Sequence, residues 1–180
     1  MKRQFSAERL DVRAFAEDAA ELAGSTPLGS LQRLAAEAKG AVEGRQVDWS
    51  AQGELRNASH VQPDVWLHLQ AHALLPMTCQ RCLEPVDVPL DVDRAFRFVA
   101  DEDTAAAEDD EAEEDLLAIS RAFDLPALME DELLMEVPVV PRHDVCPHAV
   151  PLSVADPGFE EAAAPEHPFA RLKVLKTDRS

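Results

Sequence analysis

The chain has 180 residues, 46% of them hydrophobic, and a formal net charge of -18 at pH 7. This length suits one domain or a small domain with tails, and the charge disfavours broad attraction to RNA or DNA and favours basic partners. No stretch approaches about 20 apolar residues, so we expect no membrane span. The lack of an export signal and the odd count of three cysteines predict a reducing cytoplasm.

The first third of the chain predicts two short helices. Residues 8–23 have a helix-forming composition, and the sequence GSTPLGSL then interrupts the pattern. Residues 29–39 predict a second helix, with Ser30 as its N-cap because a serine hydroxyl can accept from a free backbone N–H. We therefore expect the N-terminal part to supply helices that can cover a sheet.

The middle of the chain changes from helical to strand periodicity. Apolar and polar residues alternate in VDWSAQGELR, in VWLHLQAHALL and in PVDVPLDVDRAFRFV, so each segment predicts a strand with one buried face. The short links between them predict an antiparallel meander that is polar on one side. Pro89 falls on the polar side and cannot donate to a ladder, so we expect the third strand to be an edge or to bulge there.

An acidic run follows the predicted strands. The sequence DEDTAAAEDDEAEED, residues 101–115, carries ten of the negative charges and has no apolar periodicity. Such a composition is typical of a disordered or loosely held segment. We therefore predict an acidic loop at about residues 100–117.

A further helix is predicted over residues 125–136. Asp124 and Pro126 suit its first turn, and Pro138 ends it. The apolar residues within it fall at helical spacing. Much of the remaining helix surface is acidic, through Glu130, Asp131 and Glu132.

The sequence CQRC places Cys79 and Cys82 where the second predicted strand ends and the third begins, at a hairpin tip. Two thiolates on such a turn can share a zinc ion, and Cys146 with His143 or His148 would complete a tetrahedral set. Dithiol redox chemistry is a second interpretation, although such pairs usually begin a helix rather than join two strands. The third interpretation, which we favour at this point, is reduced thiols that shape the turn.

The sequence contains no other motif for catalysis or cofactor binding. It has no glycine-rich phosphate loop, no G-x-S-x-G and no H-E-x-x-H. His68 and His72 are four residues apart on one predicted strand, which separates them by about 13 Å and prevents them from sharing a metal. A solvated strand face is the simpler explanation for both.

Several of these segments, taken together, resemble the YceD family, the large ribosomal RNA subunit accumulation proteins of bacteria, which have relatives in plastids. The matching pieces are CQRCLEPV, FDLPALMEDELLMEVPVVPRH and HPFARLKVL, in the family's order. The resemblance implies a role in the synthesis, processing or stability of large-subunit (23S) ribosomal RNA and no enzymatic activity. It also implies that Cys79 and Cys82 are the family's hallmark pair, with Cys146 where some relatives carry further cysteines.

An acidic protein can support ribosomal RNA by two physical routes. In the first, a basic ribosomal protein or assembly factor faces the acidic segments, with interaction residues Arg81, Glu130, Asp131 and Glu132. In the second, a local basic patch contacts RNA, and the candidates are Arg81 beside Arg94 and Arg97, and the tail residues Arg171, Lys173, Lys176 and Arg179. We favour the protein route and expect neither DNA nor a membrane as a partner.

We predict an α+β fold, in which an antiparallel sheet with the cysteine pair at a hairpin tip is packed by helices from the N- and C-terminal parts. Residues 1–150 form a single domain and residues 151–180 an extended tail in this prediction. The predicted function is that of a non-catalytic factor in large-subunit ribosome biogenesis. Two alternatives stay open: a zinc- or thiol-dependent enzyme built on Cys79 and Cys82, and an acidic module that sequesters a basic protein.

Overall fold

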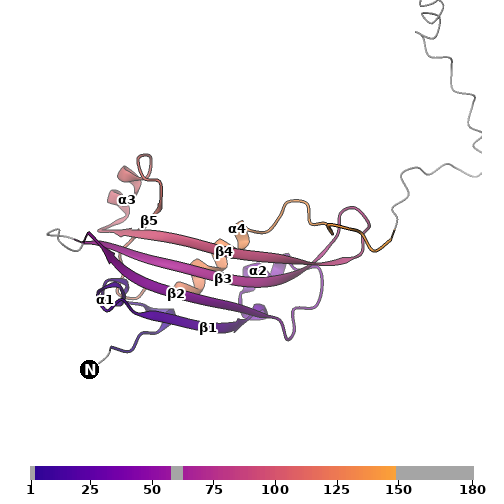
Figure 1. Cartoon of the computed structure of the whole chain (residues 1–180), viewed down its shortest axis with the longest axis horizontal. Coiled ribbons are helices and arrows are strands. Elements are labelled where there is room, and N and C mark those ends of the chain that lie inside the picture. Colours follow the sequence, from indigo (N-terminus) through magenta and orange to yellow (C-terminus); the bar gives the residue numbers. More distant parts are fainter. Residues whose placement is uncertain (1–2, 58–62, 149–180) are drawn as a thin grey trace, which may run out of the picture. The chain divides into compact units, whose positions relative to one another are not determined.

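The fold was analysed in a computed structural model, which describes residues 3–57 and 63–148. A five-stranded sheet runs in the order β1-β2-β3-β4-β5 (Figure 1). Its strands are β1 (Glu21–Pro27), β2 (Gln46–Arg56), β3 (Asp64–Thr78), β4 (Pro85–Val99) and β5 (Asp115–Ala118). Neighbours are antiparallel from β1 to β4, whereas β5 runs parallel to β4. The predicted α+β class and the meander of three long strands are confirmed.

Helices from both ends of the described chain pack on the sheet. The α-helices are α1 (Val12–Glu17), α2 (Gln32–Glu37), α3 (Glu102–Glu108) and α4 (Leu125–Met135), and the short 3-10 turns are η1 (Ala7–Arg9) and η2 (Leu28–Ser30). Helix α1 contacts β2 and β3, while α4 contacts β3, β4 and α2. None of the helices within residues 3–57 and 63–148 is long and apolar enough to cross a membrane.

Strand alternation places one continuous core beneath these helices. Along β3, alternate residues from Val65 to Leu75 are buried, and the residues between them lie at least partly in solvent. The same core includes Phe15 of α1, Leu34 of α2 and Leu133 of α4. The long strands are therefore amphipathic ribbons whose hydrophobic face is covered by helices from both termini, as their period of two predicts.

The N-terminal third differs from its prediction. Residues 8–23 do not form one helix, because α1 ends at Glu17 and Ala19 adopts a left-handed backbone with φ of 44°. The chain then pairs with β2 as β1, an edge strand with exposed side chains and no clear apolar alternation. Ser30 is not the N-cap of α2: Leu31 occupies that position, and the Ser30 hydroxyl donates to the Pro27 carbonyl at 2.6 Å.

The acidic run is also ordered rather than a loose loop. Asp101 caps α3 by accepting from the backbone N–H of Thr104 at 2.8 Å, and the alanines that follow favour a helix. Arg97 of β4 pairs with Glu108 and Glu114, which offsets part of the charge repulsion. The run then leads into β5, so local capping and ion pairs outweigh its acidic composition.

The expectation of an edge at Pro89 is confirmed. Among the described residues, β5 pairs with β4 only over Phe96–Val99, so β4 has no strand on its outer side around Pro89. Asp124 and Pro126 begin α4 as predicted, with the Asp124 carboxylate accepting from the N–H of Ala127 at 3.0 Å. The predicted tail, residues 151–180, and its basic residues lie outside the described residues.

Candidate metal centre

The connection between β3 and β4 carries the two closely spaced cysteines. Thr78 and Pro85 pair across the strands, and residues 79–84 form the turn between them. The N–H of Cys79 donates to the Glu84 carbonyl and that of Leu83 donates to the Cys79 carbonyl, both at 2.9 Å. These bonds fold the segment, which we call the cysteine turn, tightly enough to bring both cysteine side chains to one side.

A second segment reaches the cysteine turn from the end of α4. Residues 137–146, which we call the strap, contain Pro138 and Pro141, neither of which can continue a helix. The backbone N–H of Gln80 donates to the Pro141 carbonyl at 2.8 Å, joining turn and strap directly. The strap thereby carries His143 and Cys146 back to the turn, although they are far from it in sequence.

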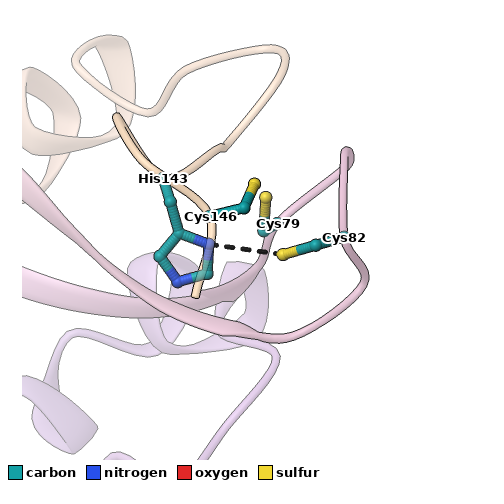
Figure 2. Close-up of side chains that lie close together, drawn as sticks. All are labelled: Cys79, Cys82, His143 and Cys146. Atoms are coloured by element: carbon teal, nitrogen blue, oxygen red, sulfur yellow. Dashed lines mark hydrogen bonds between the residues drawn. The ribbon is translucent and has the colours of Figure 1, made fainter. Parts of the chain in front are cut away.

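The two segments bring one histidine and three cysteines together. The metal-binding atoms of Cys79, Cys82, His143 and Cys146 all lie within 4.8 Å of one another (Figure 2). Cys79 is buried and the other three are partly buried, and all three cysteines are free thiols. His148 is not in this cluster, so the geometry distinguishes between the two histidines that spacing left open.

The ring of His143 is oriented by a backbone carbonyl. Its Nε2 lies 3.0 Å from the carbonyl oxygen of Pro85, which can only accept, so the proton is assigned to Nε2. This leaves Nδ1, which is 3.4 Å from the Cys82 sulfur, without a proton and free to bind a metal. Metal-binding histidines usually donate their second ring N–H in this way, because the bond fixes the tautomer and the ring orientation.

The surroundings of the cluster favour a thiolate at Cys79 and disfavour one at Cys146. Burial alone would raise the pKa of Cys79, but hydrogen bonds from the backbone N–H groups of Cys82, His143 and Arg81 lower it to about 5. At Cys146, burial raises the pKa first, and hydrogen bonds and negative charge from Cys82 and Cys79 raise it further. A cation at the centre would remove this repulsion, since it stabilises all the thiolates together.

The family model described as "Large ribosomal RNA subunit accumulation protein YceD" matches residues 67–176. The chain belongs to the YceD family. The matched span includes the cysteine turn and the strap, and with them all four cluster residues. No curated protein and no solved structure matched the chain.

Three of the four predicted interaction residues of this YceD-family protein, all on α4, form ion pairs with arginines of other elements of the fold. Arg33 of α2 pairs with Glu130 and Asp131 of α4, and Arg94 of β4 pairs with Glu132. Burial is the main reason that the pKa of Glu132 is raised, and Arg94 opposes the rise. These carboxylates therefore help to fix α4 in the fold, which limits how freely they can face a partner.

The arginines proposed for RNA contact do not form one patch. Arg81 lies exposed on the cysteine turn, while Arg94 and Arg97 lie in the far half of β4. At about 3.3 Å per strand residue, the turn and Arg94 are tens of ångströms apart. Arg94 and Arg97 are each held by carboxylates. The predicted grouping of Arg81 beside Arg94 and Arg97 is thus wrong, because the length of β4 separates them.

The two strand histidines are confirmed as a solvated face. His68 pairs with Asp93 and His72 with Asp91, and all four side chains are exposed. His72 lies directly opposite Asp91, whereas His68 lies opposite Ala95 and reaches Asp93 diagonally, so both pairs are cross-strand contacts between β3 and β4.

Sequence reasoning missed the backbone groups that complete the cluster. The Pro85 carbonyl that orients His143 and the Gln80–Pro141 bond that joins turn and strap leave no residue-type signal. It also missed the second role of Glu130, which accepts from the backbone N–H groups of Arg33 and Leu34 and so caps α2 from another helix. The poor capping residue at Leu31 is the one sequence signal for this contact.

Proposed function

We propose that this chain is a non-catalytic factor in biogenesis of the large ribosomal subunit, and that Cys79, Cys82, His143 and Cys146 hold one structural zinc ion. The family description ties the chain to accumulation of large-subunit ribosomal RNA. The observation that carries the zinc proposal is the convergence of four ligand atoms from two segments within 4.8 Å. The proposal places the protein in the cytoplasm, where its thiols stay reduced.

The donor set fits zinc better than the other metals. Three sulfurs and one imidazole nitrogen are soft and borderline ligands, which suit tetrahedral zinc and exclude magnesium or calcium, which prefer oxygen. Zinc–sulfur bonds of about 2.3 Å place tetrahedral ligand sulfurs about 3.8 Å apart. The ligand atoms lie within 4.8 Å of one another, so each sulfur–sulfur distance needs to shorten by about 1 Å or less to fit zinc.

The same ligand count favours a structural ion over a catalytic one. A catalytic zinc usually keeps one position open for water or substrate, whereas four protein ligands close the coordination sphere. The sequence, moreover, offers none of the common catalytic motifs. We therefore assign the ion the task of fastening the strap to the cysteine turn, which supports a binding role and not turnover.

Cobalt substitution tests the ligand set directly. Titrating the zinc-free protein with cobalt(II) should produce the intense visible absorption of a tetrahedral thiolate site at one equivalent, and zinc should displace it. Cys146→Ser should lower the thiolate-to-cobalt charge-transfer intensity, while His148→Ala should leave it unchanged. A weak, octahedral-type spectrum in the wild-type protein would contradict the assignment.

The large negative charge supports a protein partner in preference to direct RNA contact. A protein with a net charge of -18 gains little from counterion release on RNA, and two of the candidate arginines already bind carboxylates of this chain. A basic ribosomal protein or assembly factor would instead be attracted over a long range. The function thus proposed is support of 23S ribosomal RNA through a ribosomal protein or assembly factor.

Depletion of the protein in its own host tests this function. We expect a loss of 23S ribosomal RNA and of free large subunits relative to small ones, restored by the wild-type gene. A variant with Cys82→Ser should restore less than wild type, whereas His148→Ala should restore fully. Normal levels of large-subunit RNA and a normal ribosome profile after depletion would rule the function out.

A further inference from the structure

Exposed apolar side chains concentrate on the cysteine turn and the strap. The large hydrophobic residues that are exposed within residues 3–57 and 63–148 are Leu74, Leu83, Met135, Val139, Val140 and Val145. Leu83 is 73% exposed, Val139 98%, Val140 56% and Val145 84%. We call these four residues the apolar surface. Apolar side chains that gather on one part of a soluble protein commonly mark a binding site.

Leu83 is unusual in its backbone as well as its exposure. Its φ of 62° lies in the left-handed region, which favours glycine and costs conformational free energy for a residue with a Cβ. A leucine in such a position is normally explained by packing, but most of this side chain lies in solvent. Neither the turn geometry nor the core of the described chain requires leucine at this position. A contact with another molecule would explain the leucine.

The apolar surface is held in a fixed arrangement. Val139 and Val140 lie between Pro138 and Pro141, whose rings restrict the backbone, and the Gln80–Pro141 hydrogen bond ties this part of the strap to the turn. Figure 2 shows the side chains of His143 and Cys146 meeting those of the turn from the strap side. A surface ordered in advance binds a partner with a smaller loss of entropy.

Two hollows border the strap and provide depth. One, of about 470 Å³, is lined by Met77, Leu134 and Val139 among others. The other, of about 640 Å³, is lined by Val88, Val140 and Val145 among others. Pro138 lines both hollows, and charged residues such as Lys39 in the first and Asp87 in the second line them beside the apolar ones. The valines therefore stand between two depressions that offer a partner both apolar and charged contacts.

The charge of the chain selects among occupants of this surface. The apolar surface has no aromatic side chain on which a base could stack, and a net charge of -18 repels phosphate, which disfavours RNA. A second copy of the chain would bring another -18 and be repelled in the same way. A basic protein is attracted over a long range and can then bury its own apolar residues against the valines.

We propose that the apolar surface docks an apolar segment of a basic protein partner. This inference rests on the proposed function, in that it names the kind of partner through which the chain acts. Long-range charge brings the partner to the acidic chain, and Leu83, Val139, Val140 and Val145 supply the short-range contact. The proposed zinc ion would hold the turn and strap, and hence the surface, in its binding arrangement.

A photo-crosslinking amino acid at single positions of the full chain tests this inference in the host cell. The probe replaces Val139 in one strain and Gln52, an exposed residue of β2, in a control strain. We expect Val139, and not Gln52, to crosslink to a protein of net positive charge, identified by mass spectrometry. Adding Val140→Ser and Val145→Ser should reduce this crosslink about tenfold or more, while the exposed Ala106→Ser in α3 should leave it unchanged.

Each other outcome overturns the inference. A crosslinked dimer would identify a second copy, and crosslinked RNA would identify a nucleic-acid face. An acidic partner would remove the charge argument, and equal yield at Gln52 would show that the contact is not confined to the apolar surface. The thermal stability and zinc content of the serine variant should match wild type, which separates loss of contact from loss of fold. Large-subunit RNA is measured in the same strains: normal RNA after depletion refutes the proposed function, whereas a missing crosslink with RNA loss refutes this inference alone.

Discussion

Removing the metal ligands of the strap should destabilise the protein, and the entropy of loop closure sets the scale of the loss. Cys82 and His143 lie 61 positions apart, so a cross-link between turn and strap closes a long loop in the unfolded chain. The loop-closure relation used for disulfides gives a stabilisation of up to about 4 kcal/mol for a loop of this length. We therefore expect a loss of about 4 kcal/mol of unfolding free energy, at a fixed free zinc concentration, when the double variant His143→Ala/Cys146→Ser removes both strap ligands.

Urea unfolding of wild type, the double variant and His148→Ala, each with zinc and with a chelator, measures this loss. The chelator should lower the wild-type midpoint to near that of the double variant, and His148→Ala should respond as wild type does. Binding to the native state alone stabilises it by mass action, so the wild-type midpoint should also rise with free zinc concentration. A double variant as stable as wild type in zinc, or a wild-type midpoint that does not change with the chelator, would refute the zinc cross-link between the cysteine turn and the strap.

Three further predictions concern the fold that holds the site. Gly53→Ala should lower the unfolding free energy by about 2 kcal/mol in urea, because the new Cβ would lie 2.7 Å from the Phe15 ring. Gly29→Ala should cost far less, since its Cβ would meet nothing closer than 3.7 Å. Equal losses would contradict the packing of α1 on β2. Glu130→Ala should cost about 1 kcal/mol by the same assay, since it removes the cap of α2; no change would show that water replaces it. Hydrogen bonds from the Thr104 side chain and backbone lower the pKa of Asp101. The cap therefore stabilises α3 fully above the ordinary aspartate pKa, and this stability is lost as pH falls through the lowered value. NMR signals of α3 should show the loss in wild type and not in Asp101→Ala.

The long strands and α4 were predictable because their signals are local. Alternation along residues 64–78 and 85–99 specifies a buried face without reference to any other part of the chain. Asp124 and Pro126 mark the start of α4 in the same local way. Family resemblance in the cysteine turn and strap pointed correctly to the YceD family, and the model over residues 67–176 confirms it.

The misjudged segments depend on contacts between distant residues. β1 is specified by its backbone pairing with β2, which leaves no alternation in ELAGSTP. The acidic run is held as α3 and β5 in part because Arg97 on β4 binds Glu108 in its middle and Glu114 near its end, which composition does not reveal. The four cluster residues could be named from spacing and type, but the choice of His143 over His148 needed the strap's path and the Pro85 carbonyl.

The zinc content of the purified protein is the most direct test of the proposed metal site. Protein prepared without chelator is analysed by elemental mass spectrometry beside Cys82→Ser. We predict about one zinc per wild-type chain, as a four-ligand site requires, and little in the variant. A metal-free wild-type protein whose three thiols titrate freely would contradict this prediction. The cysteine turn would then be a turn shaped by reduced thiols without a metal.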